Sequence, residues 1–130
     1  MIDVMEQSKI PTRELYSGEK IPCVGLGPFG SDKYGADAVS EAVYGAVKYG
    51  YRLIDCASVY EDKIGQVLHR LFEEKVVQRQ DLFITSKVWN DMHGQGQVME
   101  SCRKSLKDLG LETIDLYFVH WPFPNYHAPG

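Results

Sequence analysis

The chain has 130 residues, the length of one ordinary domain, and its 44% hydrophobic and 25% charged residues are typical of a globular protein in water. Its formal net charge of −4 gives no reason to expect nucleic acid or an anionic membrane surface as a partner. No run approaches the roughly 20 apolar residues of a membrane span, and the polar start of the chain does not resemble a signal peptide.

The cysteines and histidines indicate the compartment and the absence of a metal site. Cys23, Cys56 and Cys102 are odd in number, widely spaced and without a CxxC pair. This pattern argues against a disulfide scaffold or a zinc cluster and fits a reducing compartment. His69 and His93 lack paired-ligand spacing, so no metal is expected. We expect a cytoplasmic protein.

The first expected elements are a flexible tail, a hairpin and a short strand. Residues 1–12 have no apolar run and are assigned to the tail. Segments 13–16 and 20–22 flank a turn that contains Gly18, which is typical of a β-hairpin. A brief apolar strand over residues 23–27 follows and ends in glycines.

Helices and strands then alternate. Apolar residues recur at helical spacing from residue 36, and Gly50 lies where such a helix is expected to end. Strands are predicted over residues 51–57, 82–88 and 114–121. The second helix has an apolar stripe formed by Ile64, Val67, Leu68, Leu71 and Phe72. The third helix is expected to end at Gly110. Its apolar face is expected to consist of Val98, Cys102, Leu106 and Leu109.

This order predicts an α/β fold with parallel strands and helical crossovers. The strands are short and rich in Ile, Leu, Val and Phe, as expected where both faces of a sheet are covered. A doubly wound open sheet and a (β/α)8 TIM barrel both fit the order. A barrel needs about 250 residues, so in that case residues 13–130 form the N-terminal half of a single barrel domain with about four β/α units. Its C-terminal half would be the missing partner.

Four reactive side chains lie at or just beyond strand ends. Asp55 is near the end of the second strand, Tyr60 follows in the loop, Lys87 ends the third strand and His120 ends the fourth. Because the carboxyl ends of parallel strands open on one side, these side chains are expected to converge. Asp55 and Lys87 carry opposite charges and are expected to pair there.

Proton transfer to a carbonyl oxygen is the chemistry that this set suits. Tyr60 would be the general acid, although a phenol with a pKa of about 10 is a poor donor near neutrality. A neighbouring Lys87 ammonium would lower that pKa while Asp55 holds the lysine, and His120 would orient the carbonyl. The hydride would come from a cofactor, because no side chain supplies one.

The segments that carry these residues resemble motifs of the aldo-keto reductase family. GYRLIDCASVY (residues 50–60) resembles the family's GYRxxDxAxxY signature. TSKVW (residues 85–89) is similar to its strand-three lysine motif, and DLYFVHWP (residues 115–122) to its DLYLxHWP. VGLG (residues 24–27) matches the opening strand. The resemblance runs from about Arg13 to the last residue.

The resemblance implies a (β/α)8-barrel oxidoreductase that reduces aldehydes or ketones to alcohols with NADPH, with NADH not excluded. The residues at the family's catalytic positions are Asp55, Tyr60, Lys87 and His120. Those at its substrate-pocket positions are Phe29, Val59, Trp89 and Trp121. Those expected at the nicotinamide end of the cofactor are Gly27, Pro28, Phe29 and Asp55.

Two departures from the family pattern concern the loop and the pocket. The family follows its tyrosine with an Asn-Glu pair and reaches the helix glycine two residues later than this chain, which has only residues 61–64 before Gly65. Pro28-Phe29 stands where a Thr-Trp pair is common. The first departure bears on the start of the second helix, and the second on the shape of the pocket.

Two alternatives stay open. Residues 25–30 satisfy the GxGxxG pattern of a Rossmann dinucleotide fold, but residues 31–35 separate it from the helix and Pro28 removes a backbone N–H. That alternative also leaves Tyr60, Lys87 and His120 without a role. A regulatory or structural subunit with the aldo-keto fold is the second alternative. The 130 residues by themselves are expected to be inactive.

Overall fold

The computed structural model describes residues 9–28 and 34–123, and its first element is the predicted hairpin. Strands β1 (Thr12–Glu14) and β2 (Lys20–Pro22) pair antiparallel. Gly18 makes the turn with a φ of 90°, which glycine adopts without strain. β1 starts inside the segment predicted as a tail, and residues 1–8 of that tail lie outside the described residues.

A parallel sheet of three strands follows, in the order β3-β4-β5. These are β3 (Leu53–Asp55), β4 (Phe83–Val88) and β5 (Leu116–Val119). Leu26 forms a parallel bridge with Ile54, so the first predicted strand joins the edge of β3 at this one bridge. The predicted parallel α/β order is therefore confirmed.

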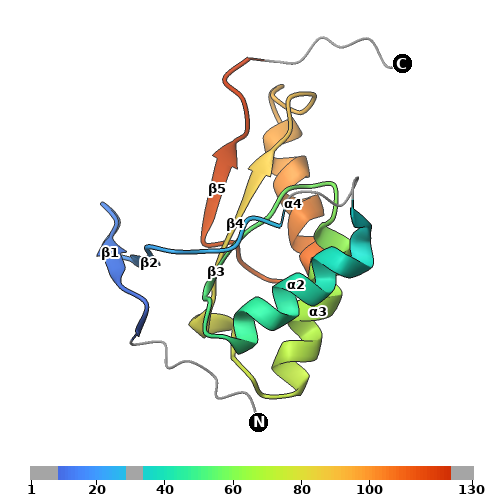
Figure 1. The fold of residues 1–130 in the computed structure, drawn as a ribbon. Helices are drawn as coiled ribbons and strands as arrows, with labels where there is room; N and C mark the ends of the chain where they lie inside the picture. Colours follow the sequence, from blue (N-terminus) through green and yellow to red (C-terminus); the bar gives the residue numbers. More distant parts are fainter. Residues whose placement is uncertain (1–8, 29–33, 124–130) are drawn as a thin grey trace.

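Three helices cover one side of this sheet, while the β1-β2 hairpin lies on the other side (Figure 1). They are α2 (Ala36–Lys48), α3 (Glu61–Glu73) and α4 (Gln97–Leu109). A one-turn 3-10 helix, η2 (Arg79–Asp81), leads into β4. Within the described ranges, none of the helices is both long and apolar enough to cross a membrane.

The hydrophobic core lies between the sheet and these helices. Successive residues of a strand point to opposite faces, and in β4 the side chains of Ile84, Ser86 and Val88 are buried on the helix side. The register places Asp55, Thr85 and Leu116 opposite one another, and Lys87 opposite Phe118, on the other face. The sheet thus separates an apolar helix side from a face that carries charges.

Two strands are shorter in the structure than the sequence predicted. The strand predicted over 51–57 is reduced to β3 because the chain turns away after Asp55 and α3 begins at Glu61. The strand predicted over 114–121 is reduced to β5, although the N–H of His120 still donates to the Val88 carbonyl at 3.1 Å.

The face predicted for the third helix is wrong in part. α4 buries Ser101, Ser105 and Leu109, whereas Val98 is exposed. The Ser101 hydroxyl lies 2.8 Å from the Tyr117 hydroxyl of the adjacent strand, so a polar contact takes the place expected for apolar packing. The predicted helix end at Gly110 is confirmed, since this residue caps α4 with a φ of 67°.

Candidate active site

The predicted ion pair between Asp55 and Lys87 is present at the carboxyl ends of β3 and β4. Lys87 Nζ lies 2.7 Å from Asp55 Oδ1 and also donates to the Cys56 carbonyl at 2.7 Å. The Thr85 hydroxyl donates to the same Asp55 oxygen at 2.6 Å. The lysine side chain is 17% exposed and the carboxylate 45%. The carboxylate therefore fixes an enclosed ammonium beside the end of the sheet.

His120 follows β5 and lies near this pair. Its ring centroid is 5.0 Å from that of Trp89 in an edge-to-face contact, and it stacks on Trp121 at 6.3 Å. Burial lowers the pKa of His120, the Lys87 ammonium lowers it further, and Asp55 opposes them. These groups favour a neutral imidazole, which can both donate and accept a hydrogen bond.

Tyr60 is placed differently from the prediction. It is the N-cap residue of α3, is 7% exposed and belongs to the core cluster that includes Ile54 and Ile64. In the described part of the chain, no hydrogen bond joins its hydroxyl to Lys87 or His120.

The pKa of Tyr60 also moves opposite to the predicted direction. Burial raises the pKa of Tyr60 to about 12, and Cys56, Asp55 and Glu61 add to the rise. Burial thus outweighs any lowering by Lys87 in this arrangement, and the predicted effect of Lys87 stays a prediction. α3 begins at the very next residue, so Tyr60 lies at the helix start, where it packs in the core.

The residues predicted to line the substrate pocket are exposed where they are described. Val59 is 80% exposed, and both Trp89 and Trp121 are exposed near His120. Trp89 also lines a hollow of about 580 Å³ together with Ser58 and Met92. Phe29 lies outside the described residues.

Of the described residues predicted to contact a cofactor, Gly27 lies beside Asp55. The Asp55 N–H donates to the Leu26 carbonyl at 2.9 Å, which places Gly27 next to the end of β3. A Cβ added at Gly27 would meet nothing within 4 Å, so the backbone there has open space on one side. Pro28 is buried. Gly27 and Asp55 thus leave room for one end of a ligand at the mouth of the sheet.

Glu61 and Ser86 form a buried polar contact that the sequence analysis missed. The Ser86 hydroxyl donates to Glu61 on the helix side of β4, one residue from Lys87 and one from Tyr60. The residues are 25 positions apart in the chain, and no motif or periodicity pointed to the contact. Thr85, whose hydroxyl donates to Asp55, lies two residues before Lys87 and therefore on the same strand face. That spacing could have predicted its contact with the ion pair.

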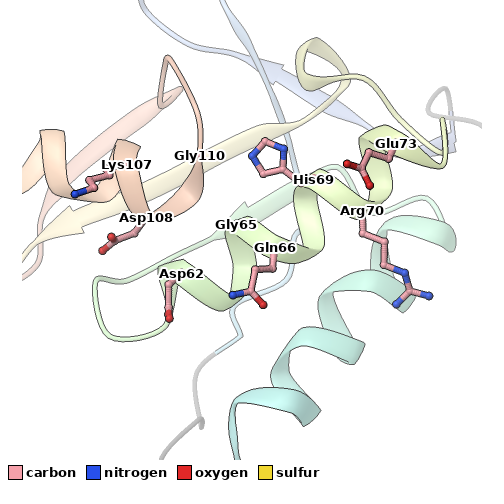
Figure 2. Close-up of a pocket in the computed structure, with 9 residues that line it drawn as sticks. All are labelled: Asp62, Gly65, Gln66, His69, Arg70, Glu73, Lys107, Asp108 and Gly110. Carbon is pink, nitrogen blue, oxygen red and sulfur yellow. The ribbon is translucent and has the colours of Figure 1, made fainter.

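A second groove lies between α3 and the end of α4 (Figure 2). Acidic residues such as Asp62 and Asp108 and basic residues such as Arg70 and Lys107 line it together. It contains none of the predicted catalytic residues. Among residues 9–28 and 34–123, no group of three or more His, Cys, Asp or Glu side chains is arranged to hold a metal ion.

Comparison with known proteins assigns the family. A family model described as the aldo/keto reductase family matches residues 23–128. The chain belongs to this family. The aldose reductase of Encephalitozoon cuniculi is 47% identical over 121 residues, which cover 91% of this chain and 38% of that protein. The NADH-dependent D-xylose reductase of Candida parapsilosis is 40% identical over 121 residues, covering 92% of this chain and 36% of that protein.

Solved structures of the family confirm the architecture. An aldo-keto reductase of the silkworm Bombyx mori, solved in complex with NADPH, superimposes with a TM-score of 0.83 at 40% identity. The match covers 88% of this chain and 37% of that protein. The chain therefore has the fold of the first α/β units of a (β/α)8 barrel, and the doubly wound alternative is wrong. It spans well under half the length of the relatives that it matches.

Proposed function

We propose that the complete protein reduces aldehydes or ketones to alcohols with NADPH, and that NADH is a possible substitute. The observation that carries this proposal is the Asp55–Lys87 ion pair beside His120, at the strand ends of a chain from the aldo/keto reductase family. The relative solved with NADPH and the relatives named as reductases support the cofactor and the substrate class. The small-molecule carbonyl is the proposed partner.

The chain's own residues hold the carbonyl and supply the proton in this proposal. When bound, the cofactor supplies the hydride, which no side chain can provide. Neutral His120 donates a hydrogen bond to the carbonyl oxygen, and Trp89 and Trp121 beside it exclude water from that oxygen. Val59 and Phe29 complete the pocket, and Gly27 and Pro28 contact the nicotinamide end.

Tyr60 is the proposed general acid, and it must leave its core position to act. An ammonium has three N–H donors, and Lys87 directs two of them to Asp55 and Cys56. The third is available for the phenol oxygen, whose pKa it would lower. Asp55, which holds Lys87, also raises the pKa of Tyr60, so the phenol lies within electrostatic reach of the ion pair. We propose that the remaining barrel, once present, shifts the loop from Cys56 to Tyr60 toward the mouth.

A non-catalytic subunit is the second candidate function. The buried Tyr60, with its raised pKa and no hydrogen bond to Lys87 among the described residues, favours it. Such a subunit would bind the nicotinamide cofactor without turnover. We also propose a cytoplasmic location without nucleic acid or membrane partners, because Cys23, Cys56 and Cys102 are all free thiols and the net charge is −4.

A chimera that completes the barrel distinguishes the reductase from the non-catalytic subunit, because only the reductase turns over. We would join this chain to the part of the E. cuniculi aldose reductase that it does not match, and follow NADPH oxidation with a simple aldehyde. Reduction is expected, and Tyr60→Phe should lower kcat by about 10²–10⁴-fold. NADPH binding without turnover would favour the subunit. Equal turnover by the Phe variant would refute the role of Tyr60.

A further inference from the structure

The loop that carries Tyr60 is attached at both ends to consecutive residues of β4. At its start, the Cys56 N–H donates to the Thr85 carbonyl at 2.7 Å, and the Cys56 carbonyl accepts a hydrogen bond from Lys87 Nζ at 2.7 Å. At its end, Glu61 accepts a hydrogen bond from the Ser86 hydroxyl. The intervening residues, including the exposed Val59, have no such attachment to β4 in the described structure.

Glu61 is buried at a place where a carboxyl group is costly. It is the first residue of α3 and only 1% exposed, and its Oε2 has no hydrogen-bond partner in the described structure. Burial raises the pKa of Glu61, while the hydroxyls of Ser86 and Ser105 act in the opposite direction. A carboxyl group at a helix start is ordinarily stable in water. Its burial is costly unless hydrogen bonds compensate for the lost water, and the hydrogen bond from Ser86 does so for one carboxyl oxygen.

The strand connects this contact to the ion pair on the opposite face of the sheet. Ser86 is buried on the helix side of β4, and the next residue, Lys87, points to the face that holds Asp55. Glu61 directly follows Tyr60 in the chain. A single hydrogen bond between the neighbours of Tyr60 and Lys87 thus fixes the spacing of the two backbone segments.

We propose that Glu61 is a positioning residue, whose hydrogen bond with Ser86 holds the Tyr60 loop in register with Lys87. The inference rests on the proposed function, because Tyr60 and Lys87 are its reacting groups. Glu61 itself touches neither substrate nor cofactor. With both ends attached, the proposed shift of the loop toward the mouth carries Tyr60 to Lys87. Loss of the bond frees the C-terminal end of the loop while the Cys56 end stays attached, so the shift is no longer directed and fewer molecules bring the phenol to the ammonium.

Hydrogen exchange on the chain tests the attachment without requiring activity. Glu61→Ala and Ser86→Ala each remove the bond, and both should accelerate amide exchange in residues 57–60 by about 10-fold or more. Glu61→Gln keeps an acceptor and should leave this exchange near the wild-type rate. Asp62→Ala, at the exposed next position of α3, is the matched control and should change nothing. Unchanged loop exchange in both Ala variants, or equal acceleration in α2 and the loop, would overturn the proposal.

Kinetics of the closed barrel test the consequence for catalysis. In the chimera with the E. cuniculi reductase, Glu61→Ala should lower kcat about 10-fold with KM nearly unchanged, and Glu61→Gln should restore most of kcat. A rise in KM alone, or no restoration by Gln, would contradict a positioning role. A chimera that binds NADPH but never reduces the aldehyde would refute the proposed function. The exchange experiment would still decide whether Glu61 holds the loop.

Discussion

Lys87 is the residue on which the proposed chemistry depends most directly. Its ammonium is enclosed by Asp55 and the Cys56 carbonyl, and the strand holds it beside His120. A charge in such a position lowers the pKa of a phenol that reaches it and stabilises the phenolate after proton transfer.

Replacement of Lys87 by Met should remove this effect. In the chimera, Lys87→Met should lower kcat/KM by about 10²–10⁴-fold, because it removes the ammonium and leaves Asp55 unpaired. Steady-state NADPH oxidation gives the measurement, and circular dichroism checks the fold. Lys20→Met, at an exposed lysine of the hairpin, is the control and should retain activity. Retention of activity by both variants would show that the ammonium has no catalytic role.

Glu61 should make the stability of the chain depend on pH. Burial raises its pKa, Asp108 raises it further, and the hydroxyls of Ser86 and Ser105 and the Lys104 ammonium lower it. The native protein therefore holds this proton to a higher pH than the unfolded chain does. This contribution to stability is complete below a pH of about 4.3 and is lost as the pH rises through the native pKa.

Urea unfolding at several pH values measures this loss. Glu61→Gln cannot ionise, so the free energy of unfolding of the variant minus that of the wild type should increase as the pH rises above about 4.3, the ordinary pKa of a glutamate in the unfolded chain. A difference that stays constant over this range would show that the carboxyl titrates alike in both states.

At the residue scale, the sequence predicted which charged side chains form an ion pair at the strand ends. It did not predict how deeply individual side chains are buried. Asp55 and Lys87 lie at ends of adjacent strands, and opposite charges there have a reason to pair. The burial of Tyr60 was not predicted, because it depends on where α3 starts and the shortened segment after Tyr60 left that start open. The contact between Glu61 and Ser86 joins distant segments, which no local pattern reports.

At the scale of the elements, α3 and α4 pack so closely that position 65 of α3 requires a glycine. A Cβ added at Gly65 would lie 2.4 Å from the backbone oxygen of Asp108 and 2.9 Å from the Leu109 carbonyl carbon. Backbone atoms cannot move away as a flexible side chain does. The helices must therefore separate if any larger residue is placed there.

Alanine substitutions at two helical glycines should have opposite effects. Gly65→Ala should destabilise the chain by about 1–3 kcal/mol through this overlap. Gly45→Ala in α2 is the matched control: its Cβ would meet nothing within 4 Å, and it should stabilise the helix by about 0.5–1 kcal/mol. Thermal or urea unfolding of both variants gives the comparison. Equal effects would mean that the α3–α4 contact tolerates the extra carbon.

Helical periodicity predicted the elements more reliably than their buried faces. α2 and α3 bury the apolar stripes that their spacing indicated, with Val43 and Leu68 among them. In α4 the serines take the buried positions, because Tyr117 of β5 presents a hydroxyl to that helix. Such a preference is set by the partner strand and is invisible within the helix sequence.

At the scale of the whole molecule, the described residues leave the outer edge of β5 free in the parallel sheet. β5 pairs with β4 on one side, and in the described structure no strand pairs with its other side. Large apolar side chains are exposed along and beyond it, namely Phe118, Val119, Trp121 and Phe123. Unpaired edges and exposed apolar groups favour association.

The isolated chain should therefore self-associate and show no turnover. Light scattering after gel filtration should give a mass above the 14.8 kDa of one chain, and NADPH should not be consumed with an aldehyde. Addition of the remaining barrel segments in the chimera should restore a monomer-sized, active species if the proposed function holds. A monomeric chain that melts cooperatively and oxidises NADPH would contradict this expectation.

At this scale, the order of strands and helices was predictable because alternation dictates a parallel sheet. The choice between barrel and open sheet was not, since closure depends on strands that this sequence does not contain. The match to solved relatives supplied that choice.

The buried thiol of Cys56 makes it possible to measure how fast this part of the sheet opens. Its side chain is fully enclosed and burial raises its pKa, so an alkylating reagent cannot reach a reactive thiolate there in the folded state. Cys23 is exposed and will be modified at once. Peptide mass spectrometry can measure the rate of alkylation at each cysteine. The slower rate at Cys56 then reports how often the segment directly after β3 becomes exposed in the native sample.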